Sequence, residues 1–465
     1  MHVDGESHVT GIPHVYTILF LLIVLSAFAT WVIPAGEYSR ASDGGASAGV
    51  SRGTYHEVES RPIGPITTLS TVHRGMVKAA DTVFFIFITF ASISVLLSTG
   101  VFHALISRVL DVFTGHSRLL VIPIFILLIG MASSTMAVFE EMFSFVPIFV
   151  TVAVAMRYDA LVGMSIVALG IGLGYSGSCL NPFTVGIAQG IAGLPPFSGA
   201  AYRVFCHLLM VTAASAYVML YAFSVSRNPL NSLIRREGPR DLRADGRMFE
   251  KHRLTARHFA VLALAAAGIA VIVWGVSRRG WYFEQLSSVY LTMGIGSGLI
   301  MGWPPDKIAH KWAEGAVEIT STCLKIAFAR GILLILEDSS ILDTLVYWLS
   351  MPLERVPKWV AAEAMLVVQT LVNFIVPSGS GQAVVSMPLM IPLSDVLGIS
   401  RQTAVLAFQF GDGISNVMWI TGSMPILCKF AEISPRLWIK WFTPLFLIIL
   451  MTQMFCIALA LAINY

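Results

Sequence analysis

The segment PSGSGQ at residues 377–382 interrupts a long apolar stretch that runs from residue 359 to residue 397. Lys358 and Arg401 flank this stretch, one at each end. Basic residues in short loops favour one side of a membrane, so both ends are expected on the same side. The stretch therefore predicts a hairpin that enters and leaves on one side, with its turn at 377–382. Irregular backbone at that depth is tolerated only against protein or a wet cavity.

A second stretch, residues 119–156, repeats this arrangement. It is apolar, and basic residues flank it at positions 118 and 157. The polar residues near its middle are Ser133, Ser134 and Thr135. The sequence thus predicts two hairpins, each with a polar tip.

The composition places both hairpins in a membrane protein. Of the 465 residues, 56% are hydrophobic and 12% are charged, whereas soluble domains have about 25% charged residues. A helix needs about 20 apolar residues to cross the hydrocarbon core. The clear candidate spans lie at about 16–34, 80–99, 202–224, 258–277, 285–302, 316–337 and 437–461. Two more, 160–190 and 402–428, are interrupted by Gly, Ser, Asn and Pro. We therefore expect an all-α polytopic membrane protein with about nine transmembrane helices, two of them broken.

Charge distribution predicts the orientation. Residues 227–257 carry nine Lys or Arg, whereas the loop at 34–74 carries four. The first segment is therefore expected in the cytoplasm and the second outside, which places the N-terminus in the cytoplasm and the C-terminus outside. The net charge of +3 does not indicate a protein that binds nucleic acid. The five cysteines stand singly in apolar runs and resemble neither a disulfide framework nor a zinc site.

The two halves of the chain resemble each other. Gly75 aligns with Gly315 at an offset of 240 residues, and Ser133 with Ser378 at 245. Counting spans from the basic linker gives the two halves opposite directions. Inverted repeats with discontinuous helices are typical of secondary transporters, whose sites lie at the repeat interface. The predicted units are 1–74 (first span and outer loop), 75–226 (first repeat), 227–257 (basic linker), 258–314 (scaffold spans) and 315–465 (second repeat).

Acidic residues inside apolar segments are candidates for the chemistry. A charge at the centre of a transmembrane helix costs roughly 3 kcal/mol, and such residues are functional by default. Glu140 and Glu141 follow the first tip, and neighbouring helical residues point in different directions, so only one is expected to face a cavity. Asp412, in the second broken span, is the best single residue for a cation or ammonium group. The alternative for the two glutamates is a wet cavity edge or a basic partner.

The broken spans offer further polar groups, because unwound helix ends direct partial charges at a ligand. Arg330, near the centre of its span, could hold a substrate carboxylate or pair with Glu140 or Glu141. Asn181 and Asn416 could instead satisfy nearby unwound backbone. The full set of candidate substrate-binding residues is Ser133, Ser134, Thr135, Glu140, Glu141, Ser178, Asn181, Pro182, Arg330, Ser378, Gly379, Ser380, Gln382, Asp412, Asn416 and Thr421. The candidate sodium ligands are Ser133, Ser134, Ser380, Gly381, Asn181 and Asn416.

Several blocks of sequence resemble the YfcC-like members of the four-carbon dicarboxylate anaerobic carrier family. They are SCLNPF at 178–183, GIAQGIAG at 186–193, SGSGQ at 378–382, MPLM at 387–390 and AFQFGDG at 407–413. The resemblance implies the ion-transporter superfamily architecture: a scaffold part, a transport part with two opposed re-entrant hairpins, and a homodimer in the bacterial inner membrane. It also implies uptake or exchange of small carboxylates or amino acids, basic amino acids among them, with no cofactor and with Na+ or H+ as the coupling ion.

The resemblance has one departure. Relatives that carry dicarboxylates with sodium have Ser-Asn-Thr at each tip, and both tips lack the asparagine here. Together with Glu140, Glu141 and Asp412, this favours a substrate with an amine, an amino acid moved by alternating access. The alternative is a sodium- or proton-coupled carrier of dicarboxylates or short-chain carboxylates.

Two other classes of membrane protein share part of this pattern. A channel has no need of opposed broken helices. A membrane-embedded protease is suggested only by GYSG at 174–177 with His207 in the next span, and four residues are a weak signal. The expectation is a carrier and not an enzyme.

Overall fold

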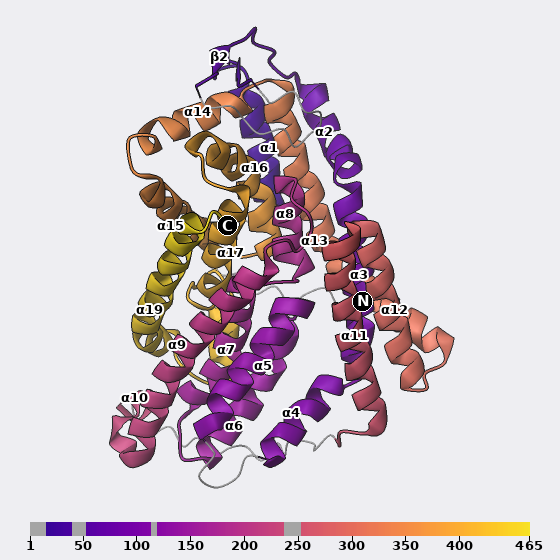
Figure 1. Cartoon of the computed structure of the whole chain (residues 1–465), viewed down its shortest axis with the longest axis vertical. Coiled ribbons are helices and arrows are strands. Elements are labelled where there is room, and N and C mark those ends of the chain that lie inside the picture. Colours follow the sequence, from indigo (N-terminus) through magenta and orange to yellow (C-terminus); the bar gives the residue numbers. More distant parts are fainter. Residues whose placement is uncertain (1–14, 40–52, 113–118, 237–252) are drawn as a thin grey trace.

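The computed structural model describes residues 15–39, 53–112, 119–236 and 253–465. Almost all of this is helical (Figure 1), and a short antiparallel pair of strands, β1 (Gly36–Glu37) and β2 (His56–Glu57), sits at one end of the molecule. The predicted linker at 227–257 falls largely outside the described residues, as does part of the loop at 34–74.

One group of helices forms what we call the long-helix bundle. Its helix α3 packs on α12 and α13, α13 also packs on α1 and α2, and α11 packs on α12. The longest of these helices is α13. At a rise of about 1.5 Å per residue, its 34 residues span about 50 Å. It is therefore longer than the hydrocarbon core of a bilayer, which is about 30 Å thick. The members of the bundle are α1 (Val15–Ala29), α2 (Pro65–Lys78), α3 (Ala80–Ser98), α11 (Ala256–Arg279), α12 (Phe283–Ile300) and α13 (Pro305–Asp338).

The other helices form the hairpin bundle, which occupies the left and centre of Figure 1. From the first half of the chain come α5 (Val121–Met136), a 3-10 turn (Glu140–Phe145), α6 (Val146–Ala155), α7 (Ala160–Ser176), a π turn (Pro182–Gly186), α8 (Ile187–Ala192) and α9 (Ala200–Arg227). From the second half come α15 (Lys358–Ile375), α16 (Gly379–Leu397), α17 (Arg401–Gly413), a 3-10 turn (Ile414–Val417), α18 (Met424–Ala431) and α19 (Pro435–Ala462). The short helices α4 (Val101–Val112), α10 (Leu233–Arg236) and α14 (Leu342–Leu353), with a 3-10 turn at Pro229–Asn231, complete the chain.

Local sequence sets where the hairpin-bundle helices begin. Asp159 accepts a hydrogen bond from the Val162 backbone N–H at 3.2 Å and so caps α7. Ser400 and Ser434 cap α17 and α19 in the same way, at 3.1 and 3.3 Å. These caps satisfy N–H groups that have no partner within the helix.

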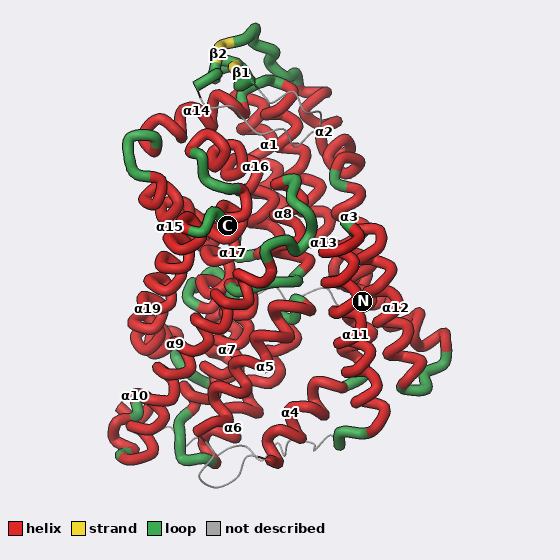
Figure 2. Tube along the Cα trace, in the orientation of Figure 1, coloured by secondary structure: helices red, strands yellow, loops and turns green. Residues whose placement is uncertain are grey.

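Both sequence-predicted broken spans are interrupted. The first stops at Ser176 and resumes at residue 182, and the second stops at Gly413 and resumes as α18 at Met424. Figure 2 shows loop segments at mid-height of the molecule, between its two ends. The first break is buried, so its unwound backbone lies inside the protein.

Six helices among the described residues are long and apolar enough to cross a bilayer: α3, α9, the Ala256–Val276 part of α11, α13, α15 and α19. Five of them coincide with sequence-predicted spans. The sixth, α15, is an arm of the hairpin predicted at 359–397. The expected spans at 16–34 and 285–302 do not reach this standard, because α1 offers only a shorter apolar helix at Leu19–Ala29 and α12 carries several polar residues.

The two halves also meet in a reciprocal contact. A Cβ on Gly75 would lie 2.7 Å from the backbone N of Gly331, and a Cβ on Gly315 would lie 2.9 Å from the Cα of Ala91. The predicted offset of 240 residues relates the two contacts: it takes Gly75 to Gly315, and it takes Ala91 to Gly331. Glycine at 75 and 315 thus lets the α2–α3 segment and α13 approach closely in two equivalent places.

Candidate functional site

The polar centre of the hairpin bundle is Asp412, near the end of α17. Its side chain is completely buried. Its Oδ1 accepts hydrogen bonds from Asn373 Nδ2 at 3.1 Å and from Asn416 Nδ2 at 3.0 Å, whereas Oδ2 has no partner. A buried carboxylate oxygen without a partner is costly, so this atom is suited to a cation, an ammonium group or a proton.

A network of amides holds the Asp412 carboxylate in place. Asn373, on α15, also donates to Gln382 Oε1 at 3.0 Å, and its Oδ1 accepts from Ser415 Oγ at 2.7 Å. Gln382, on α16, donates in turn to Gln369 Oε1 on α15 at 2.8 Å. These bonds tie both arms of the second hairpin to α17.

The first turn of α16 lies against Asp412. A Cβ on Gly379 would lie 2.7 Å from Asp412 Oδ2 and 2.6 Å from Thr184 Cγ2, so only glycine fits. The buried Thr184 hydroxyl also has no hydrogen-bond partner. Asp412 Oδ2, the Thr184 hydroxyl and the N-terminus of α16 therefore converge, and we call this group the Asp412 site.

The other side of the Asp412 site is formed by the segment that follows α7, where the first broken span is interrupted. The side-chain oxygen of Asn181 accepts from the backbone N–H groups of Phe183 and Thr184 at 2.8 and 3.2 Å, and its amide donates to the Ser133 carbonyl oxygen at 3.4 Å. The Asn181 side chain thus forms hydrogen bonds to the unwound backbone, which was the alternative to ligand binding that the sequence allowed. Pro182 begins the π turn, where its missing N–H costs nothing.

The two breaks touch each other. The backbone N–H of Ile414 donates to Ser176 Oγ at 2.8 Å, and Gly413 packs against Ser176 so closely that a Cβ would clash. Ser178 is buried beside them with no partner for its hydroxyl.

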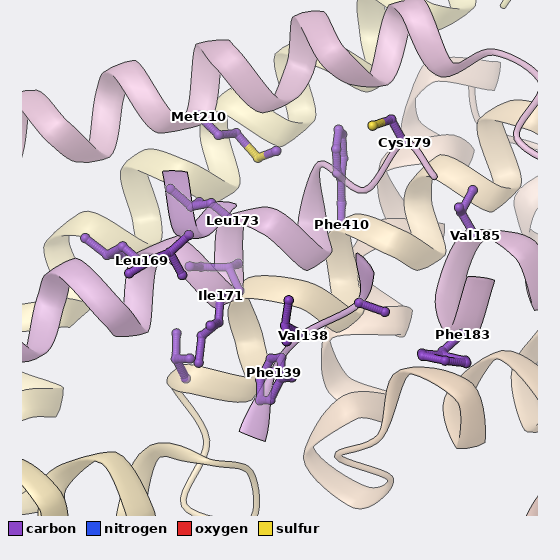
Figure 3. Close-up of a cluster of buried hydrophobic side chains, with 14 of the residues drawn as sticks. Val138, Phe139, Leu169, Ile171, Leu173, Cys179, Phe183, Val185, Met210 and Phe410 are labelled. Carbon is purple, nitrogen blue, oxygen red and sulfur yellow. The ribbon is translucent and has the colours of Figure 1, made fainter. Parts of the chain in front are cut away.

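Apolar side chains surround the break (Figure 3). Phe410 lies beside the loop that carries Cys179, and Phe183 and Val185 flank its other end. All four are buried. This packing keeps water away from the polar groups, which strengthens their electrostatic interactions.

The first hairpin differs from the expectation. Helix α5 continues to Met136, and the chain turns at Ala137, whose φ is 57°. The expected tip residues therefore lie in the last helical turn, and their hydroxyls bond to nearby groups: Ser133 donates to the Val138 carbonyl at 2.7 Å, Ser134 accepts from the Cys179 N–H at 3.1 Å, and Thr135 donates to the Met131 carbonyl at 2.7 Å.

Glu140 and Glu141 lie in the 3-10 turn that follows. Glu141 is half-buried and accepts from the Phe139 backbone N–H at 3.0 Å. Glu140 is exposed and interacts electrostatically with Glu318 and Lys325 of α13. Both glutamates therefore interact with Glu318 of the long-helix bundle, and Glu140 also interacts with Lys325.

Arg330 does not pair with either glutamate. Its nearest acidic partner is Glu337, one oxygen of which lies 3.9 Å from Arg330 Nη1 on the same helix. The neighbouring Asp338 pairs with Arg74 at 2.6 Å. Glu337 and Asp338, at the end of α13, thus each have an arginine partner.

The other predicted residues of the second half are divided. Gln382 and Asn416 join the Asp412 network, and Ser380 is buried. Ser378 caps α16, accepting from the Gly381 N–H at 3.4 Å, and Thr421 donates to the Phe374 carbonyl at 2.7 Å. The candidate sodium ligands thus have different partners: Ser133 bonds within the first hairpin, Ser134 bonds to Cys179 in the α7 break, and Asn416 bonds to Asp412.

Sequence reasoning missed several residues of the site. Asn373 and Gln369 lie in an apolar arm of the second hairpin, where an amide side chain is unusual and could have been noticed. Thr184 directly follows the block SCLNPF at 178–183. Arg203 was also missed. It is completely buried on α9 and donates to Gln409 Oε1 and Gln402 Oε1, both at 2.9 Å.

No group of three or more His, Cys, Asp or Glu within the described ranges could hold a metal ion. The protease interpretation is wrong. His207 Nδ1 lies 3.1 Å from the Leu173 carbonyl oxygen, and Ser176 Oγ bonds to Ile414 N and Gln453 Nε2, so no serine–histidine pair is formed.

Broken helices that meet inside a bundle of membrane-spanning helices are typical of secondary transporters, and comparison with known proteins agrees. The model of the C4-dicarboxylate anaerobic carrier family, DcuC, matches residues 12–462. The chain therefore belongs to this family of multi-pass membrane transporters, as its sequence blocks indicated.

Relatives and solved structures point the same way. YfcC of Escherichia coli (strain K12), named as a candidate basic amino acid antiporter, is 28% identical and matches 92% of each chain. A candidate short-chain fatty acid transporter of the same organism is 26% identical over 38% of this chain and 39% of its own length. The YdaH transporter of Alcanivorax borkumensis superposes with a TM-score of 0.76 at 15% identity, covering 97% of this chain and 99% of its own. MtrF of Neisseria gonorrhoeae, from a class of antimetabolite efflux pumps, has a TM-score of 0.74 at 14% identity, with 96% and 94% covered. The transporter fold is shared with both.

Proposed function

We propose that this protein is a secondary active transporter that moves a small amino acid by alternating access, as a homodimer in the bacterial inner membrane. The observation that carries the proposal is the buried, unpartnered Oδ2 of Asp412 beside the N-terminus of α16. A helix N-terminus favours a carboxylate and the aspartate favours an ammonium group. The site thus offers one partner for each charge of a zwitterion.

A basic amino acid is the substrate class that we favour. Its additional cationic group would suit the carboxylates of Glu140, in the 3-10 turn of the first hairpin, and Glu318, on α13, which, among the described residues, outnumber the one basic side chain that interacts with Glu140, Lys325. The name of the relative YfcC supports the same class. Arg330 remains a candidate for the substrate carboxylate, and Na+ or H+ a candidate coupling ion.

The test is uptake into proteoliposomes that contain the purified protein. The panel includes arginine, ornithine, lysine, a neutral amino acid, succinate and a short-chain fatty acid, each with imposed sodium or proton gradients and with counter-substrate inside. We expect saturable arginine or lysine uptake that internal substrate stimulates. Transport of succinate with no transport of any amino acid would overturn the amino acid proposal.

The alternative is a carrier of dicarboxylates or short-chain carboxylates. The family description and the candidate short-chain fatty acid relative favour it. Under this alternative, Asp412 would bind the coupling cation, and the carboxylate would bind at the N-terminus of α16. Uptake that requires sodium and is inhibited by succinate or butyrate, but not by lysine, would support it.

A further inference from the structure

A second acidic residue lies inside the hairpin bundle and is not part of the Asp412 site. Glu363, in the second turn of α15, has only 8% of its surface exposed, and its Oε2 has no hydrogen-bond partner. Its neighbours Ala361, Ala362 and Leu366 are buried apolar residues. An ionised carboxylate in such surroundings is costly, so a neutral, protonated form is favoured when the residue is closed off from water.

Within the part of the chain that the structure describes, no ion pair joins Glu363 to a basic side chain. Helix α15 packs on α16, α17, α19 and the 3-10 turn at Ile414–Val417, and the charged groups of those elements are engaged elsewhere or distant. Asp395 of α16 pairs with Arg401 of α17 at 2.8 Å, and Asp412 belongs to its own amide network. Lys358, on α15 itself, donates to the Gly398 carbonyl at 3.2 Å. The charged residues of α19, Arg436 and Lys440, begin that helix, whereas its last residues lie beside the start of α15.

A cavity lies close to Glu363 along α15. Its volume is about 670 Å³, it lies at the open end of the second hairpin, and its walls include Trp359, Thr403, Ala460 and Tyr465. Trp359 is one helical turn before Glu363 on α15. Deeper in the molecule, Gly411 of α17 packs against Gln369 and Thr370. Along α15, Glu363 therefore comes after the residue that lines the cavity and before the residues that pack against α17.

The same face of α15 continues to the Asp412 site. Residues 363, 366, 370 and 373 follow one another at helical spacing of three or four and so share a face. Asn373, the last of them, bonds to Asp412 directly. Ten residues of helix separate Glu363 from Asn373, which is about 15 Å at about 1.5 Å per residue. A change in the charge at Glu363 would thus act on the arm that holds the Asp412 carboxylate.

We propose that Glu363 is a proton-binding site of the carrier, separate from the Asp412 site, which releases its proton to the cavity water and takes it up again as the second hairpin moves. The proton leaves the carboxyl as a hydrated proton, and the carboxylate that remains is solvated by the cavity. This rests on the proposed function in one respect: the proton couples to transport only if the protein is a carrier. Intramembrane carboxyls in proton-driven transporters have this role in general.

The first experiment measures coupling in proteoliposomes, with the substrate identified by the uptake panel. With one proton coupled per substrate, an imposed pH difference of about one unit changes the steady-state accumulation ratio of the wild type about tenfold. The variant Glu363→Gln, which mimics the protonated form, should show no change with the pH difference and should retain substrate exchange. Glu363→Asp should restore part of the response, and the exposed control Glu354→Gln should behave as wild type. An unaltered pH response in Glu363→Gln, or a wild type that ignores the gradient, would overturn the proposal.

The second experiment does not depend on transport. Infrared spectra of the purified protein in lipid, recorded against pH in H2O and D2O, report protonated carboxyl groups. The wild type should show a carboxyl band that titrates with pH and is absent from Glu363→Gln but present in Asp412→Asn. If no substrate is carried but this band behaves as described, the proposed function fails and the proton site stands. If the spectrum of Glu363→Gln is identical to that of the wild type, Glu363 is not the proton-binding site.

Discussion

At the residue scale, the buried carboxylate of Asp412 carries the strongest prediction. Asp412→Asn keeps an acceptor for Asn373 and Asn416 but removes the charge that the unpartnered oxygen offers to a ligand. Hydrogen bonds to charged groups contribute about 1.5–3 kcal/mol, so the affinity for the cationic group should fall by roughly ten- to a hundredfold. Initial uptake rates measured against substrate concentration in proteoliposomes would report the change as a raised KM.

Asp338→Asn is the matched control, because Asp338 is also an aspartate near a helix end but pairs with Arg74 at the surface. Its uptake should equal that of the wild type. If Asp412→Asn and the wild type have equal KM values, Asp412 does not bind the cationic group of the substrate.

Glycine at position 379 leads to the second residue-scale prediction. The methyl group of Gly379→Ala would overlap Thr184 Cγ2 and Asp412 Oδ2. Overpacking of this kind costs about 1–3 kcal/mol and displaces the α16 N-terminus from the carboxylate. Uptake should be lost, with a modest decrease in thermal stability. Gly64→Ala, at a position with nothing within 4 Å of the added Cβ, is the control and should transport normally; full activity of Gly379→Ala would argue against a tight site.

The residues of the Asp412 site were only partly predictable. Asp412, Gln382 and Asn416 could be predicted because charged and amide side chains in apolar runs are conspicuous. Asn373 is also an amide in an apolar run, but its role and that of Thr184 could not be assigned from sequence, because both roles depend on contacts between separate segments of the chain. Ser133 and Ser134 were expected at a tip, but the helix continues past them to a left-handed residue, Ala137, whose position no local pattern marks.

At the element scale, Arg203 joins α9 to α17. It is buried without an acidic hydrogen-bond partner and donates to Gln402, Gln409 and the Ser198 carbonyl. Gln409 bonds in turn to the backbone of the α7 break, at the Ser178 carbonyl. The guanidinium therefore positions a glutamine that holds the unwound segment.

Replacement of Arg203 should weaken this connection between elements. Arg203→Gln removes hydrogen bonds to a charged donor, each worth about 1.5–3 kcal/mol, and leaves buried acceptors unsatisfied. We expect a lower melting temperature in detergent, followed by intrinsic tryptophan fluorescence. The control Arg227→Gln removes an arginine that stacks on the ring of Phe223 at the end of α9 and should melt as wild type does. Equal melting temperatures for both variants would contradict the positioning role.

At the scale of the whole molecule, the two halves meet through the reciprocal contacts of Gly75 with Gly331 and Gly315 with Ala91. Contacts exchanged by a constant offset are what two related halves in opposite orientation produce. This supports the inverted repeat, and with it the prediction that the basic segment at 227–257 and the loop at 34–74 lie on opposite sides of the membrane.

Accessibility labelling tests that orientation. All five native cysteines are buried, so single reporters can be added with little background. Arg253→Cys should react only with a reagent that reaches the cytoplasm, and Glu57→Cys, which is exposed beside β1, should react from outside in intact cells. Labelling of both from the same side would refute the opposed halves.

The amino-acid sequence by itself determined the membrane class, the places where two spans break, and the family, because hydropathy, glycine and proline act locally and leave their pattern in the chain. Tertiary structure alone decided which polar groups meet. It placed Thr184 and Gly379 against Asp412, turned Glu140 toward α13, and gave Arg330 a partner on its own helix. The physical reason is that a polar side chain takes its partners from whatever packs nearest in space, and residues such as Thr184 and Asp412, far apart in the sequence, meet only when the chain folds.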